Sequence, residues 1–134
     1  MREPDAQSEH SIETYKSLIH LGTFGLKFVQ LANGGGAIAI LAYLGDVTSR
    51  GNPAPDLTYP MASFVIGLVL GGVAIVTAYW TQLLLYNESL GARQRGGHVG
   101  LLYTSMGLLV LSLAAFAVGS LCAVAAFGAA DAAA

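Results

Sequence analysis

Residues 61–85 read MASFVIGLVLGGVAIVTAYWTQLLL, a run that contains no Asp, Glu, Lys or Arg. The run is part of an uncharged stretch of 31 residues between Asp56 and Glu88. A helix needs about 20 mostly apolar residues to cross the hydrocarbon core of a bilayer. This stretch therefore predicts a membrane-spanning helix over residues 60–86.

Two further stretches have the same character, one on each side of the first. An uncharged run of 18 residues follows Lys27, and a run of 35 residues without Asp, Glu, Lys or Arg follows Arg95. They predict spanning helices over residues 28–45 and 99–128. Because the runs are continuously apolar rather than alternating, they favour helices over barrel strands. We expect an all-α membrane protein with three transmembrane helices, organised as a single membrane domain over residues 1–134.

The overall composition excludes two other classes of protein. Of the 134 residues, 54% are hydrophobic and only 10% are charged, whereas about a quarter of the residues of soluble globular proteins are charged. The apolar content is also far too high for a disordered chain. The net charge of −2 gives no reason to expect nucleic-acid binding.

The segment before the first span, residues 11–27, is more polar and predicts an amphipathic helix. Its apolar residues recur at three- and four-residue spacing, namely Ile12, Tyr15, Ile19, Gly22 and Leu26. The segment can lie on the membrane surface. It can also continue into the first span as one long helix, with a bend permitted at Gly22 and Gly25. We favour the continuous helix.

Small residues in the spans predict close helix–helix contacts. In the first span the candidates are Asn33, Gly34, Gly35 and Gly36. We interpret them as a packing notch, in which Gln30 and Asn33 hydrogen-bond to a neighbouring helix. The alternatives are a locally unwound ligand site, as in the broken helices of transporters, and a flexible hinge.

The other two spans carry small residues at four-residue spacing. The candidates are Ser63, Gly67 and Gly71 in the second span, and Ala115, Gly119 and Ala123 in the third. Such faces allow helix backbones to approach closely. Three helices carry more of these faces than a single three-helix bundle needs. We therefore expect a homo-oligomer or a place in a larger membrane-protein complex.

Basic residues predict the orientation, because Lys and Arg favour the cytoplasmic side. With three spans, the N-terminus and the second connector share a side. That side has five basic residues, which are Arg2, Lys16, Lys27, Arg93 and Arg95, and the other side has only Arg50. We expect a cytoplasmic N-terminus and a periplasmic C-terminus.

A polar and aromatic cluster is expected at the inner face. Its members are Lys16, His20, Trp80, Gln82, Arg93 and Arg95. The aromatic residues at the end of the second span are typical of an interfacial anchor. The cluster is also a candidate docking surface for a partner protein or for the headgroups of anionic membrane lipids.

No residue pattern points to catalysis, a metal site or a cofactor. The spans have no ionisable residue at their centres, where such a residue would be the default sign of a functional site. Asp46, Asp56 and Glu88 lie in or beside connectors, so we expect them to be solvated. Cys122 is the only cysteine, and we expect it to pack as a small apolar residue. We expect a protein that is not an enzyme.

Two segments resemble those of small, uncharacterised proteins of the bacterial inner membrane. They are LANGGGAIAILAYLG (residues 31–45) and LLLYNESLG (residues 83–91). The resemblance implies a bacterial inner-membrane location and carries no activity with it. From the residues we expect a protein that acts through helix–helix assembly, as an accessory subunit or a homo-oligomer. The alternative is a holin-like or channel-type pore or transport subunit.

Overall fold

The computed structural model describes residues 6–51, 54–90 and 96–132, which form three α-helices. Helix α1 spans Ala6–Ser49, α2 spans Thr58–Ser89 and α3 spans His98–Ala132. Each helix is long and apolar enough to cross a membrane. The prediction of an all-α fold with three spanning helices is confirmed, and the chain fits a multi-pass membrane protein.

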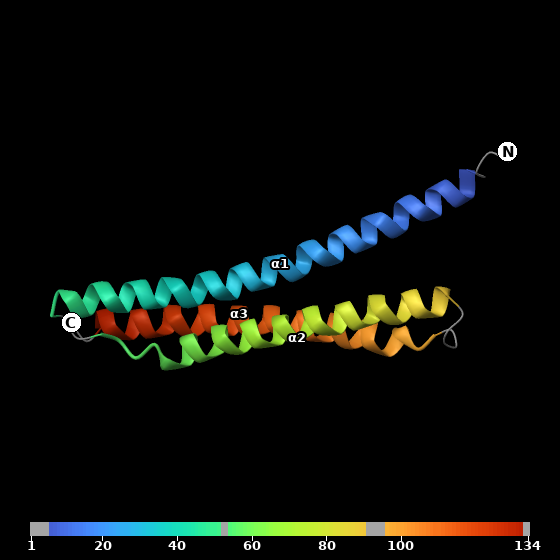
Figure 1. The fold of residues 1–134 in the computed structure, drawn as a ribbon. Helices are drawn as coiled ribbons and strands as arrows, with labels where there is room; N and C mark the ends of the chain where they lie inside the picture. Colours follow the sequence, from blue (N-terminus) through green and yellow to red (C-terminus); the bar gives the residue numbers. More distant parts are fainter. Residues whose placement is uncertain (1–5, 52–53, 91–95, 133–134) are drawn as a thin grey trace.

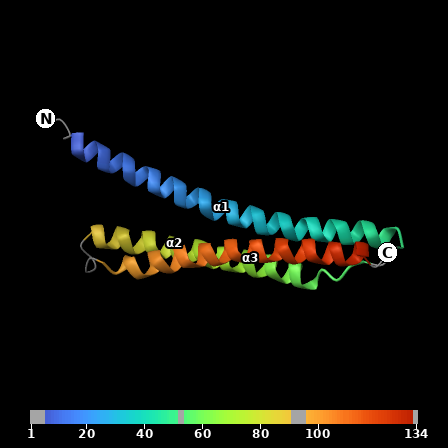
Figure 2. The same cartoon turned by 180° about the vertical axis from the view of Figure 1, so that it is seen from behind.

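Helices α2 and α3 form an antiparallel hairpin, and α1 runs lengthwise beside it. Helices α2 and α3 run side by side, and the C-terminal half of α1 packs against both (Figure 1). The N-terminal half of α1 diverges from the hairpin, and the reverse view shows the same separation (Figure 2). The C-terminal ends of α1 and α3 lie at one end of the bundle, and the N-terminal end of α1 lies toward the other (Figure 1).

Helix α1 is a single continuous helix of 44 residues. The predicted amphipathic segment, residues 11–27, and the predicted span, residues 28–45, are two parts of it. This confirms the continuous helix over a separate surface helix. No proline interrupts the segment. In its C-terminal half, packing against the hairpin at Gly34 and Gly36 supports the helix. At 1.5 Å per residue, α1 is about 66 Å long, roughly twice the hydrocarbon thickness of a bilayer.

The spans begin and end slightly beyond the predicted limits of 60–86 and 99–128. At the start of α2, a carboxylate oxygen of Asp56 accepts a hydrogen bond from the backbone N–H of Thr58 at 3.0 Å. Hydrogen bonds from the Thr58 side chain and backbone lower the pKa of Asp56. Pro60 lies in the first turn of α2, where its missing N–H leaves no intrahelical bond unmade.

Candidate functional site

The three helices meet at a polar contact around Asn33. Its side chain is fully buried, with an exposed fraction of 0%. The amide nitrogen donates hydrogen bonds to the carbonyl of Val29 at 3.0 Å, the carbonyl of Ser112 at 3.2 Å and the Ser112 hydroxyl at 3.3 Å. The Oδ1 atom of Asn33 has no hydrogen-bond partner among the described residues. Asn33 thus ties α1 to α3 in the interior of the bundle.

The same contact continues to α2. The Ser112 hydroxyl donates to the carbonyl of Gly67 at 2.7 Å. The Asn33 amide fills the space beside Gly67, so that a Cβ atom at Gly67 would collide with it. About two helical turns away, the Ser105 hydroxyl donates to the carbonyl of Ala74 at 3.0 Å. Serine hydroxyls of α3 therefore bond to backbone carbonyls of α2, as interhelical polar contacts do within membranes.

Gln30 makes a second polar contact between α1 and α2. The amide of Gln30 is satisfied when its nitrogen faces α2 carbonyls and its oxygen faces α2 N–H groups. In this orientation the nitrogen donates to the carbonyl of Leu68 at 3.3 Å, and the oxygen accepts from the N–H of Gly72 at 3.2 Å. A Cβ atom at Gly71 would lie 3.0 Å from the Gln30 side chain. The glycines of α2 thus leave room for the two long amide side chains of α1.

An aromatic ring occupies the next contact along the bundle. Phe64 of α2 is buried between glycines of the other two helices. A Cβ atom would lie 2.7 Å from the ring at Gly36 and 2.9 Å from it at Gly119. The Phe116 ring packs beside it, with centroids 5.7 Å apart. Here the small residues make room for one large side chain.

The remaining small residues contribute less to these contacts. Gly34 faces Leu68 at van der Waals distance, whereas Gly35 is exposed and has no atom within 4 Å of an added Cβ. Ser63, Ala115 and Ala123 are half-buried. Because several of the glycines pack within the chain, the small-residue faces alone are weaker support for an outside partner than the sequence suggested. The Asn33–Gly36 segment is helical, so the unwound ligand site is not found there.

The N-terminal half of α1 presents a different surface. Residues 9–24 are exposed throughout, although their apolar face continues the face that packs on the hairpin. The alternating three- and four-residue spacing runs unbroken along α1, through residues 12, 15, 19, 22, 26, 29, 33, 36 and 40. We call this line of residues the α1 seam. Its first part was predicted, but its continuation into the packed contacts at Asn33 and Gly36 was missed, although the spacing was visible.

The predicted inner-face docking residues lie on separate parts of the molecule. Lys16 and His20 are exposed on the diverging half of α1, and Trp80 and Gln82 are exposed on α2. Figures 1 and 2 show that these two segments run apart. The other two candidates, Arg93 and Arg95, lie outside the described residues.

Glu88 was predicted to be solvated, but its side chain is buried where it closes the α2–α3 hairpin. Its side chain is 6% exposed and contacts the His98 Nδ1 atom at 2.9 Å. It also accepts hydrogen bonds from the backbone N–H groups of Gly96 at 3.0 Å and His98 at 3.2 Å. The first N–H groups of a helix lack intrahelical partners, and a carboxylate that accepts hydrogen bonds from them satisfies these donors. The sequence prediction was wrong because ten residues separate the partners.

The described residues offer no evident chemistry. Among them, no group of three or more His, Cys, Asp or Glu side chains is placed to hold a metal ion. Cys122 is a half-buried free thiol. No protein-family model, curated protein or solved structure matches the chain.

Proposed function

We propose that this chain is a non-enzymatic, three-helix protein of the bacterial inner membrane that acts through helix–helix assembly. In this proposal it is a homo-oligomer or the accessory subunit of a larger membrane complex, with its N-terminus in the cytoplasm. The observation that supports assembly best is the uncovered part of the α1 seam. Ile12, Tyr15 and Ile19 are 53%, 47% and 42% exposed.

The position of this surface is the reason to expect a protein partner. Tyr59 and Trp80 lie 21 residues apart on α2, about 31 Å, which matches the hydrocarbon thickness if both mark interfaces. Near Trp80 the diverging half of α1 leaves the hydrocarbon. An apolar stripe beyond that level is unfavourable in water, and such surfaces are typically covered by another protein or by the membrane surface.

The bundle centre gives the pore alternative no comparable support. Asn33, Ser105 and Ser112 are buried, and each donates hydrogen bonds across a helix contact. A pore or transport path would need polar groups facing a continuous opening. We therefore keep assembly as the one proposed function.

Native extraction tests the proposal. The tagged full chain is extracted from its membrane in mild detergent, and particle mass and co-purifying chains are measured. We expect a homo-oligomer or a stoichiometric complex. Ile19→Asp places a charge in the seam and should weaken assembly at least tenfold, about 1.4 kcal/mol. Ser17→Asp places the same charge on another face of α1 and should leave assembly intact. A monomer without partners contradicts the proposal.

A further inference from the structure

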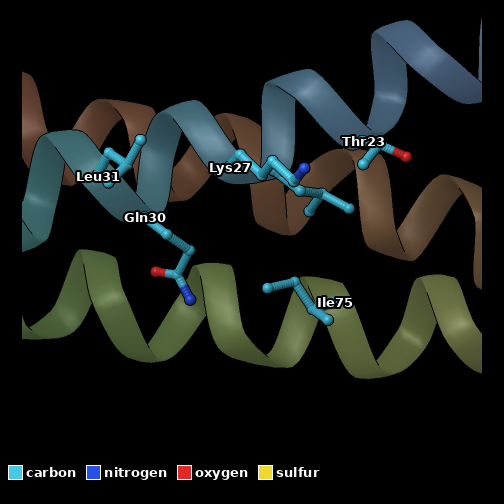
Figure 3. Close-up of a pocket in the computed structure, with 6 residues that line it drawn as sticks. Thr23, Lys27, Gln30, Leu31 and Ile75 are labelled. Atoms are coloured by element: carbon cyan, nitrogen blue, oxygen red, sulfur yellow. The ribbon is translucent and has the colours of Figure 1, made fainter.

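The space between α1 and α2, where the two helices begin to diverge, forms an open groove of about 640 Å³. Three of its lining side chains are apolar and three are polar. Figure 3 shows Gln30 and Ile75 projecting into it from opposite helices, and Lys27 running along α1 toward Thr23. The lining residues are Thr23, Leu26, Lys27, Gln30, Leu31 and Ile75.

Of the three polar lining residues, two are satisfied within the protein. The Thr23 hydroxyl donates to the carbonyl of Ile19 at 2.9 Å. The Gln30 amide pairs with the carbonyl of Leu68 and the N–H of Gly72. Lys27 forms no hydrogen bond or ion pair with any described residue. Its ammonium group is therefore the polar group of the groove that lacks a partner.

The protein offers no nearby counter-charge among the described residues. Glu13 lies 14 residues before Lys27 on the same helix, about 21 Å along its axis. Glu88 is occupied by His98. Lys27 adjoins the predicted span that begins at residue 28, and an unpaired charge within a bilayer is costly. Its ammonium group therefore needs a partner.

The register of the helices places Lys27 where a lipid headgroup can meet it. Gln30 lies beside Gly72, so that antiparallel continuation by three residues brings Lys27 near Ile75, which lines the same groove. Trp80 lies five residues beyond Ile75, about 8 Å toward the interface. A lysine side chain can extend over much of this distance toward the headgroups while its stem stays in the apolar region.

We propose that the α1–α2 groove binds one anionic phospholipid, with an acyl chain against Leu26, Leu31 and Ile75 and the phosphate on Lys27. The groove combines apolar side chains with a single unpaired cation, because its other polar side chains, Thr23 and Gln30, are satisfied within the protein. This combination matches an amphiphile with one anionic head. This site lies deeper in the membrane than the uncovered α1 seam. It does not depend on the proposed assembly, because its residues come from one chain.

Native mass spectrometry of the delipidated full chain in detergent tests the proposal. The probes are phosphatidylglycerol and phosphatidylcholine with identical acyl chains. We expect one phosphatidylglycerol to be retained per chain, in preference to phosphatidylcholine. Lys27→Gln should reduce that preference about fivefold, the effect of one lysine near an anionic headgroup. Lys16→Gln, which removes the same charge from the same helix outside the groove, should retain it.

Further variants make each outcome decisive. Lys27→Arg should keep the preference, and Ile75→Trp, which fills the groove but leaves Lys27, should weaken retention of the lipid. Helical content by circular dichroism checks that each variant is folded. Equal retention of the two lipids, or equal losses in the Lys16 and Lys27 variants, would overturn the proposal. Retention that Ile75→Trp leaves unchanged, or displacement of phosphatidylglycerol by equimolar oleate, would also overturn it.

Discussion

At the residue scale, the contact between Asn33 and Gly67 shows how little space the bundle centre leaves. We predict that Gly67→Ala destabilises the fold by about 1–3 kcal/mol, because the added methyl group must displace a buried, hydrogen-bonded amide. Reversible unfolding in mixed detergent micelles, followed by circular dichroism, measures the change. Gly35→Ala is the matched control, since nothing lies within 4 Å of its added Cβ. Equal losses in both variants would contradict the packing.

Residue-level contacts were only partly predictable from the sequence. The Asn33–Gly36 notch and the small residues of α2 and α3 could be identified, because small and polar residues are unusual within long apolar runs. Which of them face the bundle could not. Rotation of a helix about its axis decides that Gly36 meets a phenyl ring while Gly35 faces outward. Lipid provides no hydrophobic force that would reveal this rotation in the apolar pattern.

At the element scale, the charge-free runs were sufficient to predict all three helices. The continuous α1 helix was favoured correctly, although the repeat that runs from Ile12 to Ile40 was recognised only as far as Leu26. The divergence of its N-terminal half could not be predicted. That half has the apolar face needed to pack on the hairpin, but the close contacts that join α1 to the hairpin at Asn33 and Gly36 lie in the C-terminal half of α1.

The α2–α3 hairpin depends on Glu88 in a way that can be tested. We predict that Glu88→Ala lowers the midpoint of thermal unfolding, because the N–H groups of Gly96 and His98 lose their acceptor and His98 loses its partner. Glu88→Gln should have a smaller effect, since an amide oxygen can still accept one of these bonds. Glu13→Ala removes an exposed carboxylate and serves as the control. A Glu88→Ala variant as stable as that control would show that the contact is not needed.

At the scale of the whole molecule, the fold and the proposed orientation make separate predictions. The N-terminal end of α1 and the C-terminal end of α2 lie toward one end of the bundle, and the C-terminal end of α1 lies at the other (Figures 1 and 2). Single cysteines introduced by Ser17→Cys, Ser49→Cys and Ser89→Cys in a Cys122→Ser background report both features. We predict that a membrane-impermeant maleimide labels Ser49→Cys in intact cells. It should label the other two only after the membrane is permeabilised.

The pattern of labelling separates the two claims. The three-span fold requires the cysteines at positions 17 and 89 to behave alike and opposite to the one at 49, whichever way the protein is inserted. The excess of basic residues at the N-terminal end then favours the cytoplasm for 17 and 89. The reverse pattern would keep the fold and overturn only the orientation. Different labelling of positions 17 and 89 would contradict the three-span arrangement itself, because those two helix ends would then lie on opposite sides of the membrane.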